Sequence, residues 1–164
     1  MVTSAYVHIP FCRQKCNYCS FVSFANSEMI EKYLESLIKE IEHFYKGEEL
    51  KTLYLGGGTP SLLSAEQVWN IISKFKISNS TEITMELNPE SVDENYLRMI
   101  KSFGVNRLSI GCQSFDENIL KIIGRKHSPS DVEFVVKSAQ SVGFDNISLD
   151  FIYGLPNQSE DSFV

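Results

Sequence analysis

Hydrophobic positions along the chain follow two periods in turn, which predicts strands and helices that alternate. Short runs rich in β-branched and aromatic residues predict strands at 5–9, 52–55, 82–87, 106–110 and 146–152. Between these runs, apolar residues recur at spacings of three and four, as in Ile30, Tyr33 and Leu37. That spacing is typical of helices that bury one face. The chain therefore consists of repeated β-loop-α units of about 30 residues each.

Capping residues mark where the expected helices begin and end. Ser64 with Gln67 forms a capping-box pattern, and Gly104 is a typical residue after a helix end. The first expected helix begins at Ser27 and stops at Gly47, and the second begins at Ser64 and has an apolar stripe through Phe75. A third covers 93–102, and a single helical turn lies within 117–123. The last runs from a cap at Ser130 through Val142, with Phe134, Val135 and Ala139 facing inward. Residues 155–164 predict a turn followed by the start of a helix. We therefore expect residues 1–164 to be one domain, truncated at its C-terminus.

Strands that alternate with helices predict an α/β fold with a parallel sheet and right-handed crossovers. The units lack a duplicated nucleotide-binding half, so we expect an open section of a (β/α) barrel. In such barrels the chemistry lies at the carboxyl ends of the strands. Unusual residues occur at each of these ends: the cysteines after the first strand, Gly56-Gly57-Gly58 after the second, Glu86 in the third, Cys112-Gln113 after the fourth and Asp150 late in the fifth.

Three cysteines, Cys12, Cys16 and Cys19, fall within eight residues directly after the first predicted strand. The spacing is too tight for a disulfide framework, and the number is odd. Three thiolates from one loop favour an iron–sulfur cluster, and three protein sulfurs would leave one iron free for a small ligand. A zinc site remains an alternative, although zinc usually takes a fourth Cys or His at finger-like spacing. His8 precedes the loop, but its place in the strand pattern favours packing or hydrogen bonding.

Composition and charge exclude several classes of function. The net charge is −6 without a basic cluster, so the sequence offers no electrostatic footprint for nucleic acid. No apolar run reaches the roughly 18 residues of a membrane span. The first residues lack the charged and apolar regions of a signal peptide. Unpaired thiolates favour a reducing compartment, and we expect a cytoplasmic protein.

Several segments, spread in order over nearly the whole chain, resemble the radical S-adenosylmethionine (SAM) superfamily. They are YVHIPF at 6–11 with the three cysteines, LGGGTPS at 55–61, ELNPE at 86–90, RLSIGCQSF at 107–115, GRKH at 124–127 and DFIYGLP at 150–156. The triple-cysteine spacing is specific to the superfamily. The first segment and GRKH narrow the resemblance to the branch of oxygen-independent coproporphyrinogen III oxidases and heme chaperones of the HemW type. The resemblance implies a radical SAM core with about five of its six β/α units present.

This resemblance also implies cofactors and the residues that bind them. A [4Fe–4S] cluster would be held by the three cysteines, and S-adenosyl-L-methionine would chelate the fourth iron. By this resemblance, the backbone of Gly57 and Gly58, with Thr59, would contact the methionine ammonium, and Glu86 and Asp150 would contact the ammonium or the ribose. Arg125 would bind the carboxylate, and Gln113 would bind the ribose. Tyr6 and Tyr18 would lie beside the cluster or the adenine. Taken singly, most of these residues also have a structural explanation: a tight turn for the glycines, a surface or helix-capping acid for Glu86 and Asp150, a solvated side chain for Arg125 and core packing for Tyr6. Cys112 is expected to be a buried spectator, and His43 to be exposed.

Within this branch, the residue two beyond Cys19 separates the two functions. The oxidases carry a further cysteine there, whereas this chain has Phe21. Phe is the pattern of the chaperones, so we expect a heme chaperone that delivers heme to acceptor apoproteins and depends on an electron donor, without porphyrinogen decarboxylation. The alternatives are an oxidase acting on a porphyrinogen and a zinc-stapled barrel without catalysis. The chaperones' His-Asn-x-x-Tyr-Trp heme motif does not occur in these residues, so no heme ligand is assigned.

Overall fold

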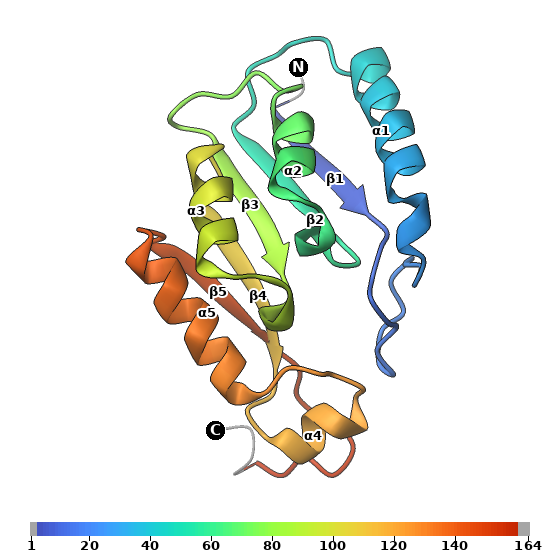
Figure 1. Ribbon diagram of the computed structural model, residues 1–164, viewed down its shortest axis with the longest axis vertical. Coiled ribbons are helices and arrows are strands. Elements are labelled where there is room, and N and C mark those ends of the chain that lie inside the picture. The colour runs from blue at the N-terminus through green and yellow to red at the C-terminus, as the bar shows by residue number, and fades with distance from the viewer. Residues whose placement is uncertain (1–2, 161–164) are drawn as a thin grey trace.

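The computed structural model describes residues 3–160 of the chain. One sheet of five parallel strands has the order β1-β2-β3-β4-β5, so each strand pairs with the next one in the chain (Figure 1). The strands are β1 (Ser4–Ile9), β2 (Thr52–Gly57), β3 (Glu82–Leu87), β4 (Arg107–Gln113) and β5 (Asn146–Phe151). Among the described residues β1 and β5 form the two edges, so the sheet stays open. The expected α/β fold with an unclosed parallel sheet is confirmed.

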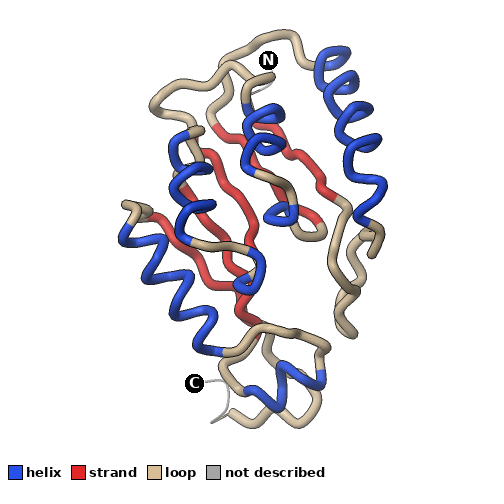
Figure 2. Tube along the Cα trace, in the orientation of Figure 1, coloured by secondary structure: helices blue, strands red, loops and turns tan. Residues whose placement is uncertain are grey.

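The helices that connect successive strands are α1 (Ile30–Phe44), α2 (Ala65–Ile72), α3 (Glu94–Ser102), α4 (Glu117–Ile122) and α5 (Pro129–Ser141), with short 3₁₀ turns η1 (Ser27–Met29), η2 (Pro60–Leu62) and η3 (Pro89–Ser91). The helices α1, α2, α3 and α5 cover one face of the sheet, and α4 lies beyond the carboxyl ends of the strands (Figures 1 and 2). The cover on one face follows from the strand order, because right-handed crossovers between neighbouring parallel strands all return on the same side. Within residues 3–160, every helix is too short or too polar to cross a lipid bilayer.

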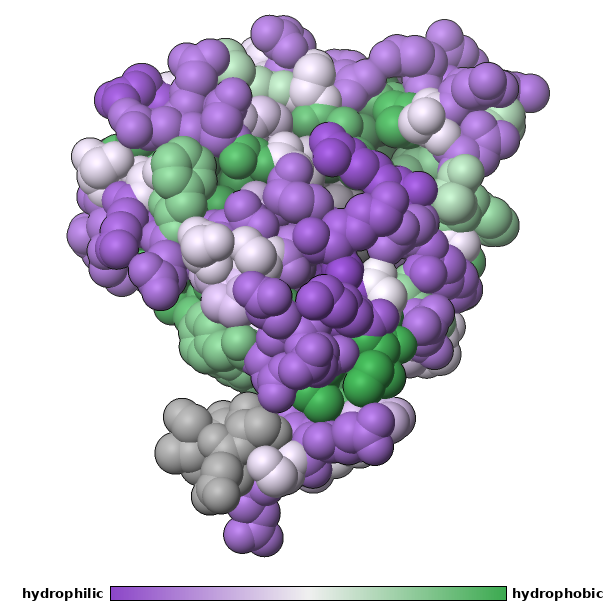
Figure 3. Space-filling model, turned by 60° about the horizontal axis from the view of Figure 1, so that its bottom comes forward, coloured by the Kyte–Doolittle hydropathy of each residue, from purple (hydrophilic) through white to green (hydrophobic). Residues whose placement is uncertain are grey.

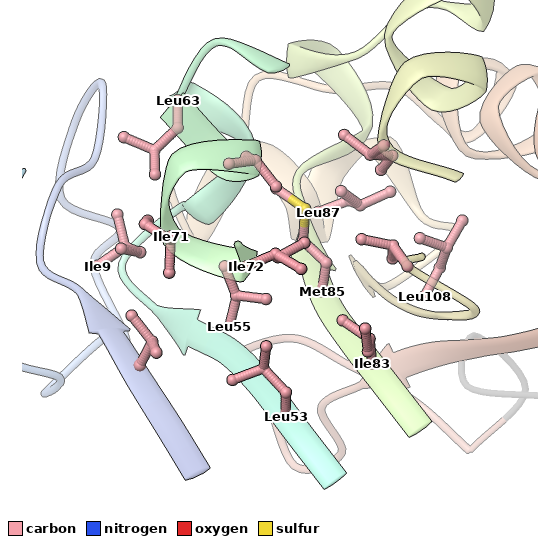
Figure 4. Packing of buried hydrophobic residues seen from close by; sticks show 14 of the residues in the cluster. Ile9, Leu53, Leu55, Leu63, Ile71, Ile72, Ile83, Met85, Leu87 and Leu108 are labelled. Carbon is pink, nitrogen blue, oxygen red and sulfur yellow. The ribbon is translucent and has the colours of Figure 1, made fainter. Parts of the chain in front are cut away.

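The hydrophobic core lies between the helices and the sheet (Figure 4). Leu55, Met85 and Leu108 come from three neighbouring strands and are fully buried, with Ile71 and Ile72 of α2 packed against the sheet. Alternate residues of each strand point to the opposite face, which no helix covers. That uncovered face is where the barrel interior lies. The period-2 pattern thus separates a structural face from a face that is available for chemistry.

The caps of the helices show where the sequence was interpreted correctly and where it was not. Ser64 and Gln67 form the expected capping box, and Asp93 caps α3 through its side chain. At the start of the first helical segment, however, Asn26 caps a 3₁₀ turn, and Ser27 does not provide the cap. α1 then ends at Phe44, before Gly47.

The last helix was predicted with the wrong cap and with one wrong inward residue, whereas Val135 and Ala139 are buried as expected. Ser128, and not Ser130, caps α5, because Asp131 completes a capping box with it and proline occupies the first turn. Phe134 was expected to face inward but is 56% exposed, whereas its neighbour Val135 is 1% exposed. The turn expected at 155–158 is present, with the amide of Gln158 donating to the carbonyl of Leu155 at 3.0 Å. The helix expected after this turn lies outside the described residues.

The exposure of these two neighbours yields a stability prediction. Val135→Ala should lower the free energy of unfolding by about 2 kcal/mol, because it removes two buried methyl groups and leaves a cavity. Phe134→Ala removes a much larger side chain but should cost less than about 1 kcal/mol, because most of that ring is already in water. Urea unfolding followed by circular dichroism measures both. A larger loss for Phe134→Ala would mean that α5 packs with a different face.

Candidate functional site

A cavity of about 330 Å³ opens at the carboxyl ends of the strands. Its lining includes eleven of the twelve residues that the sequence nominated: Cys12, Cys16, Tyr18, Cys19, Gly57, Gly58, Thr59, Glu86, Gln113, Arg125 and Asp150. The strands point toward the lower end of the molecule in Figure 1, where the loop after β1 and α4 also lie. Figure 3 turns this end forward, and hydrophilic residues cover much of it. Residues as far apart in the chain as Cys12 and Ile152 thus line one site.

Tyr6, the twelfth nominated residue, lies outside this lining. It is on edge strand β1, and its ring stacks on Tyr54 of β2 with a centroid distance of 5.8 Å. The Tyr54 hydroxyl donates to Oε1 of Glu86 at 2.9 Å. Burial, together with this hydrogen bond, raises the pKa of Tyr54 to about 12, so the phenol remains a donor at neutral pH. Tyr6 therefore does not line the cavity itself; it contacts Tyr54, which is hydrogen-bonded to the cavity residue Glu86.

The loop that carries the three cysteines is held by hydrogen bonds at its start and in its middle. At its start, the amide of Cys12 donates to the carbonyl of Phe24 at 3.1 Å. In its middle, the amide of Asn17 donates to the carbonyl of Ile123 at 3.0 Å, and its side-chain amide donates to Ile122 at 2.8 Å. The loop is thus anchored to the C-terminal end of α4, although more than 100 residues separate them.

Two of the three thiols receive hydrogen bonds from other parts of the rim. The Thr59 hydroxyl donates to Sγ of Cys12 at 3.5 Å, and Nη1 of Arg125 lies 4.0 Å from Sγ of Cys16. These contacts tie the positions of the two sulfurs to the glycine turn and to Arg125. All three cysteines are free and partly exposed to the cavity.

Cys112 differs from the other three cysteines, as the sequence had indicated. It is fully buried on the helix-covered side of β4, and burial raises its pKa to about 11. A buried neutral thiol of this kind is unreactive. In residues 3–160, no three Cys, His, Asp or Glu side chains converge closely enough to share one metal ion. A cluster does not require such convergence, because each of its thiolates binds a different iron.

The Gly56-Gly57-Gly58 turn lies against the start of the cysteine loop. A Cβ placed on Gly58 would come within 2.6 Å of the carbonyl oxygen of Phe11 and 3.0 Å of Sγ of Cys12. Gly57 has a φ of +118°, which side-chain-bearing residues rarely adopt. The amide of Gly58 also donates to the carbonyl of Ile9 at 2.8 Å. Glycine at position 58 is therefore required for the close approach of the two loops.

The two carboxylates at the strand ends both have partners within the rim. Oε2 of Glu86 accepts from the Gly57 amide at 2.9 Å, and its other oxygen accepts from Tyr54. Oδ2 of Asp150 accepts from the Ser109 hydroxyl at 2.8 Å. Each carboxylate oxygen has two lone-pair directions, so these groups are oriented and still able to accept further hydrogen bonds.

Gln113 and Arg125 complete the wall on the side of β4. Gln113 has a φ of +67°, an uncommon conformation for a residue other than glycine, at an irregularity in the β4–β5 pairing. Such strained backbone often occurs at functional sites. The guanidinium of Arg125 donates through Nη2 to the side chain of Asn88 at 2.9 Å and to the carbonyl of Gly111 at 2.8 Å.

Sequence reasoning had assigned no role to Asn88 or Ser109, although both line the cavity. Asn88 bridges the rim, since its amide nitrogen also donates to Oγ1 of Thr59 at 3.1 Å. Its position directly after a predicted strand was an available signal. Ser109 pairs in register with Glu86, so strand alternation alone predicts that it faces the same side.

Comparison with known proteins agrees with this geometry. The family model described as the radical SAM superfamily matches residues 6–164. A heme chaperone HemW from Bacillus subtilis is 40% identical to 95% of this chain, and the match covers 44% of that protein. An oxygen-independent coproporphyrinogen III oxidase from Pseudomonas aeruginosa is 33% identical to 98% of the chain, over 38% of its own length.

A solved structure gives the same result. The coproporphyrinogen III oxidase HemN from Escherichia coli, described as a radical SAM enzyme, superposes with a TM-score of 0.90 at 30% identity, covering 98% of this chain and 39% of that one. The chain therefore spans less than half the length of the relatives it matches. Membership of this family implies a [4Fe–4S] cluster and SAM as cofactors. By sequence and by fold, the chain belongs to the radical SAM superfamily.

Proposed function

We propose that Cys12, Cys16 and Cys19 hold a [4Fe–4S] cluster whose fourth iron is open to SAM. The observation that carries this proposal is that three free, partly exposed thiols line one cavity together with oriented polar groups, while the fourth cysteine is buried elsewhere. Thiolates are the usual ligands of iron–sulfur clusters. A single tetrahedral zinc would require sulfurs about 3.8 Å apart, from Zn–S bonds of about 2.3 Å.

The remaining residues of the cavity suit the separate chemical groups of SAM. Backbone at Gly57 and Gly58 is unshielded by side chains, which allows the methionine ammonium to approach, and Thr59 fixes the neighbouring thiol. Glu86 and Asp150 retain acceptor capacity for the ammonium or the ribose hydroxyls, as Gln113 does for the ribose. Arg125 supplies positive charge for the carboxylate. Tyr18 is 37% exposed, lines the cavity beside the cysteines and provides an aromatic wall. Tyr6 stacks on Tyr54, which in turn orients Glu86.

When bound, the reduced cluster supplies one electron to the sulfonium of SAM, which is chemistry that side chains cannot perform. The contribution of this chain is to hold the cluster, to orient SAM and to shield both from solvent. The glycine turn and the anchored cysteine loop set the position of the thiolates. The carboxylates and Arg125 fix the orientation of a zwitterionic ligand, because their own positions are set by hydrogen bonds.

For the biological role, we infer a heme chaperone that passes heme to acceptor apoproteins with the help of an electron donor. Support comes from relatives named HemW at up to 40% identity and from Phe21, which lines the cavity where the oxidases would carry another cysteine. An oxidase acting on coproporphyrinogen III is the second candidate, favoured by the HemN likeness. The four free thiols are compatible with the cytoplasmic location expected from the sequence.

Removing a ligand should abolish the cluster, whereas removing the buried spectator should not. Cys16→Ala is expected to eliminate the broad visible absorption of the anaerobically reconstituted protein and to reduce its iron and sulfide content. Cys112→Ala should retain all three signals, because Cys112 lies outside the cavity. Equal loss in both variants would contradict the ligand assignment. Zinc in place of iron would contradict the cluster itself.

The glycine contact gives an independent test. Gly58→Ala should reduce cluster incorporation severalfold while the chain stays folded, because the new methyl group collides with backbone of the cysteine loop. Gly47→Ala is a stringent control: Gly47 has a φ of +86°, so the substitution strains the backbone there, but nothing lies within 4 Å of its added Cβ. Iron content per folded protein, with circular dichroism as the folding check, measures the difference. Full incorporation in Gly58→Ala would refute the proposed contact.

The two candidate roles differ in a product that can be measured. A heme chaperone should transfer hemin to an apoprotein acceptor and leave coproporphyrinogen III unchanged when the reconstituted protein is incubated with SAM and dithionite. An oxidase should instead convert the porphyrinogen to its decarboxylated products, detectable by chromatography. Detectable decarboxylation above a Cys16→Ala control would favour the oxidase. Transfer of hemin without decarboxylation would support the chaperone.

A further inference from the structure

We propose that His127 is a positioning residue: its imidazole fixes the guanidinium of Arg125 so that one remaining N–H of Nη1 points to an anionic group in the cavity. The inference deepens the proposed function, because the anionic group it implies there is the carboxylate of SAM. His127 was not among the residues that the sequence nominated for the site. The support comes from the hydrogen-bond partners of the guanidinium and of the imidazole.

Four of the five N–H donors of Arg125 are already engaged by the chain. Nε donates to Nδ1 of His127 at 3.2 Å, the two protons of Nη2 serve Asn88 and Gly111, and one proton of Nη1 faces Sγ of Cys16 at 4.0 Å. A guanidinium has five N–H donors in a fixed plane, so the hydrogen bonds of its three nitrogens constrain one another. Among the described residues, one Nη1 proton is left for the cavity that Arg125 lines.

This count changes the interaction expected of Arg125. An arginine commonly binds a carboxylate through two parallel hydrogen bonds. With both Nη2 protons committed, the geometry leaves a single charge-assisted hydrogen bond to a ligand. A single donor gives specificity only if its direction is fixed. The direction of Nη1 is set by the partner at Nε, because rotation about the last side-chain bonds would move both nitrogens together.

The backbone of β4 determines which nitrogen of His127 can accept. Nε2 lies 3.0 Å from the carbonyl oxygen of Cys112, which can only accept a hydrogen bond. Nε2 must therefore carry the proton, and in a neutral imidazole Nδ1 is then an acceptor. That is the role the Nε–H of Arg125 requires. A strand carbonyl thus selects the tautomer that orients the arginine.

The surroundings of His127 keep the ring in place and neutral. Its side chain is fully buried. The charged groups around it are Arg125, the Glu90 carboxylate of η3 with Oε2 3.7 Å from Nδ1, and Asp131 at the start of α5. Burial first, and then the charge of Arg125, lower the pKa of His127, which outweighs the opposite effect of the carboxylates. The acceptor at Nδ1 is consequently present at neutral pH.

The tautomer can be measured on the chain without any cofactor. Long-range ¹H–¹⁵N correlation spectra at pH 7.5 should show His127 as a neutral ring protonated at Nε2 with Nδ1 bare, and a slowly exchanging Arg125 Nε–H. A ring protonated at Nδ1, or a rapidly exchanging Arg125 Nε–H, would overturn the proposal. This readout does not depend on whether the protein binds SAM.

Two variants separate positioning from stability. His127→Asn keeps an acceptor where Nδ1 stands, whereas His127→Phe keeps the ring but loses the acceptor; both lose the bond to Cys112. Binding of SAM and of its decarboxylated analogue is measured by calorimetry on reconstituted protein, with the exposed neighbour variant Lys126→Ala as control. His127→Phe should lower the preference for SAM over the analogue by about tenfold or more, the usual worth of a charge-assisted hydrogen bond. His127→Asn and Lys126→Ala should keep that preference.

The outcomes distinguish this inference from the proposed function on which it rests. If the wild type prefers SAM and His127→Phe does so equally, the positioning role is wrong. If both substitutions at His127 reduce the preference to the same extent, the residue acts through stability alone and the proposal also fails. If the wild type binds neither compound, the SAM site is refuted, and the tautomer spectrum still decides whether His127 holds Arg125.

Discussion

Close contact between the glycine turn after β2 and the start of the cysteine loop is the interaction on which the site depends. Gly58 leaves no room for even one methyl group beside Phe11 and Cys12. Because β1 and β2 are paired in register up to Ile9 and Gly57, the two loops leave the sheet side by side. The carboxylate of Glu86 on the next strand then holds the turn through the Gly57 amide. Strand pairing thereby brings together the cysteine loop, the glycine turn and the Glu86 carboxylate.

The sheet divides its two faces between stability and chemistry. Residues such as Leu55 and Met85 point toward the helices and are fully buried, while Tyr54 and Glu86 alternate with them on the opposite face. This division keeps the polar side chains of the rim on the face opposite the helix-covered core. The rim is linked in turn to α4, since Asn17 of the cysteine loop donates to carbonyls at the end of that helix. The C-terminal end of α4 therefore fixes the position of the cysteine loop and also leads into the segment with Arg125.

The sequence predicted most of the fold because the periods of its apolar residues are clear. All five strands, the parallel order and the capping box at Ser64 follow from pattern alone. The cap of α5 was placed at Ser130 although Pro129 favours a cap at the residue before it, and Phe134 was assigned inward because the apolar stripe of that helix is ambiguous. The cysteines, the glycine turn, Glu86, Gln113 and Asp150 were predicted to share one rim from their place at strand ends, whereas Tyr18, Thr59 and Arg125 were nominated from the family resemblance.

Contacts between those side chains were beyond the sequence, because they depend on distances between loops. Nothing in the chain order indicates that Glu86 would be occupied by Tyr54 and an amide, or that a carbonyl in β4 would select the tautomer of His127. The most direct test of the central claim is Mössbauer spectroscopy of ⁵⁷Fe-reconstituted protein before and after addition of SAM. The account predicts that the signal of one of the four irons changes and the other three stay as they were. Four irons that all remain unchanged by SAM would contradict it.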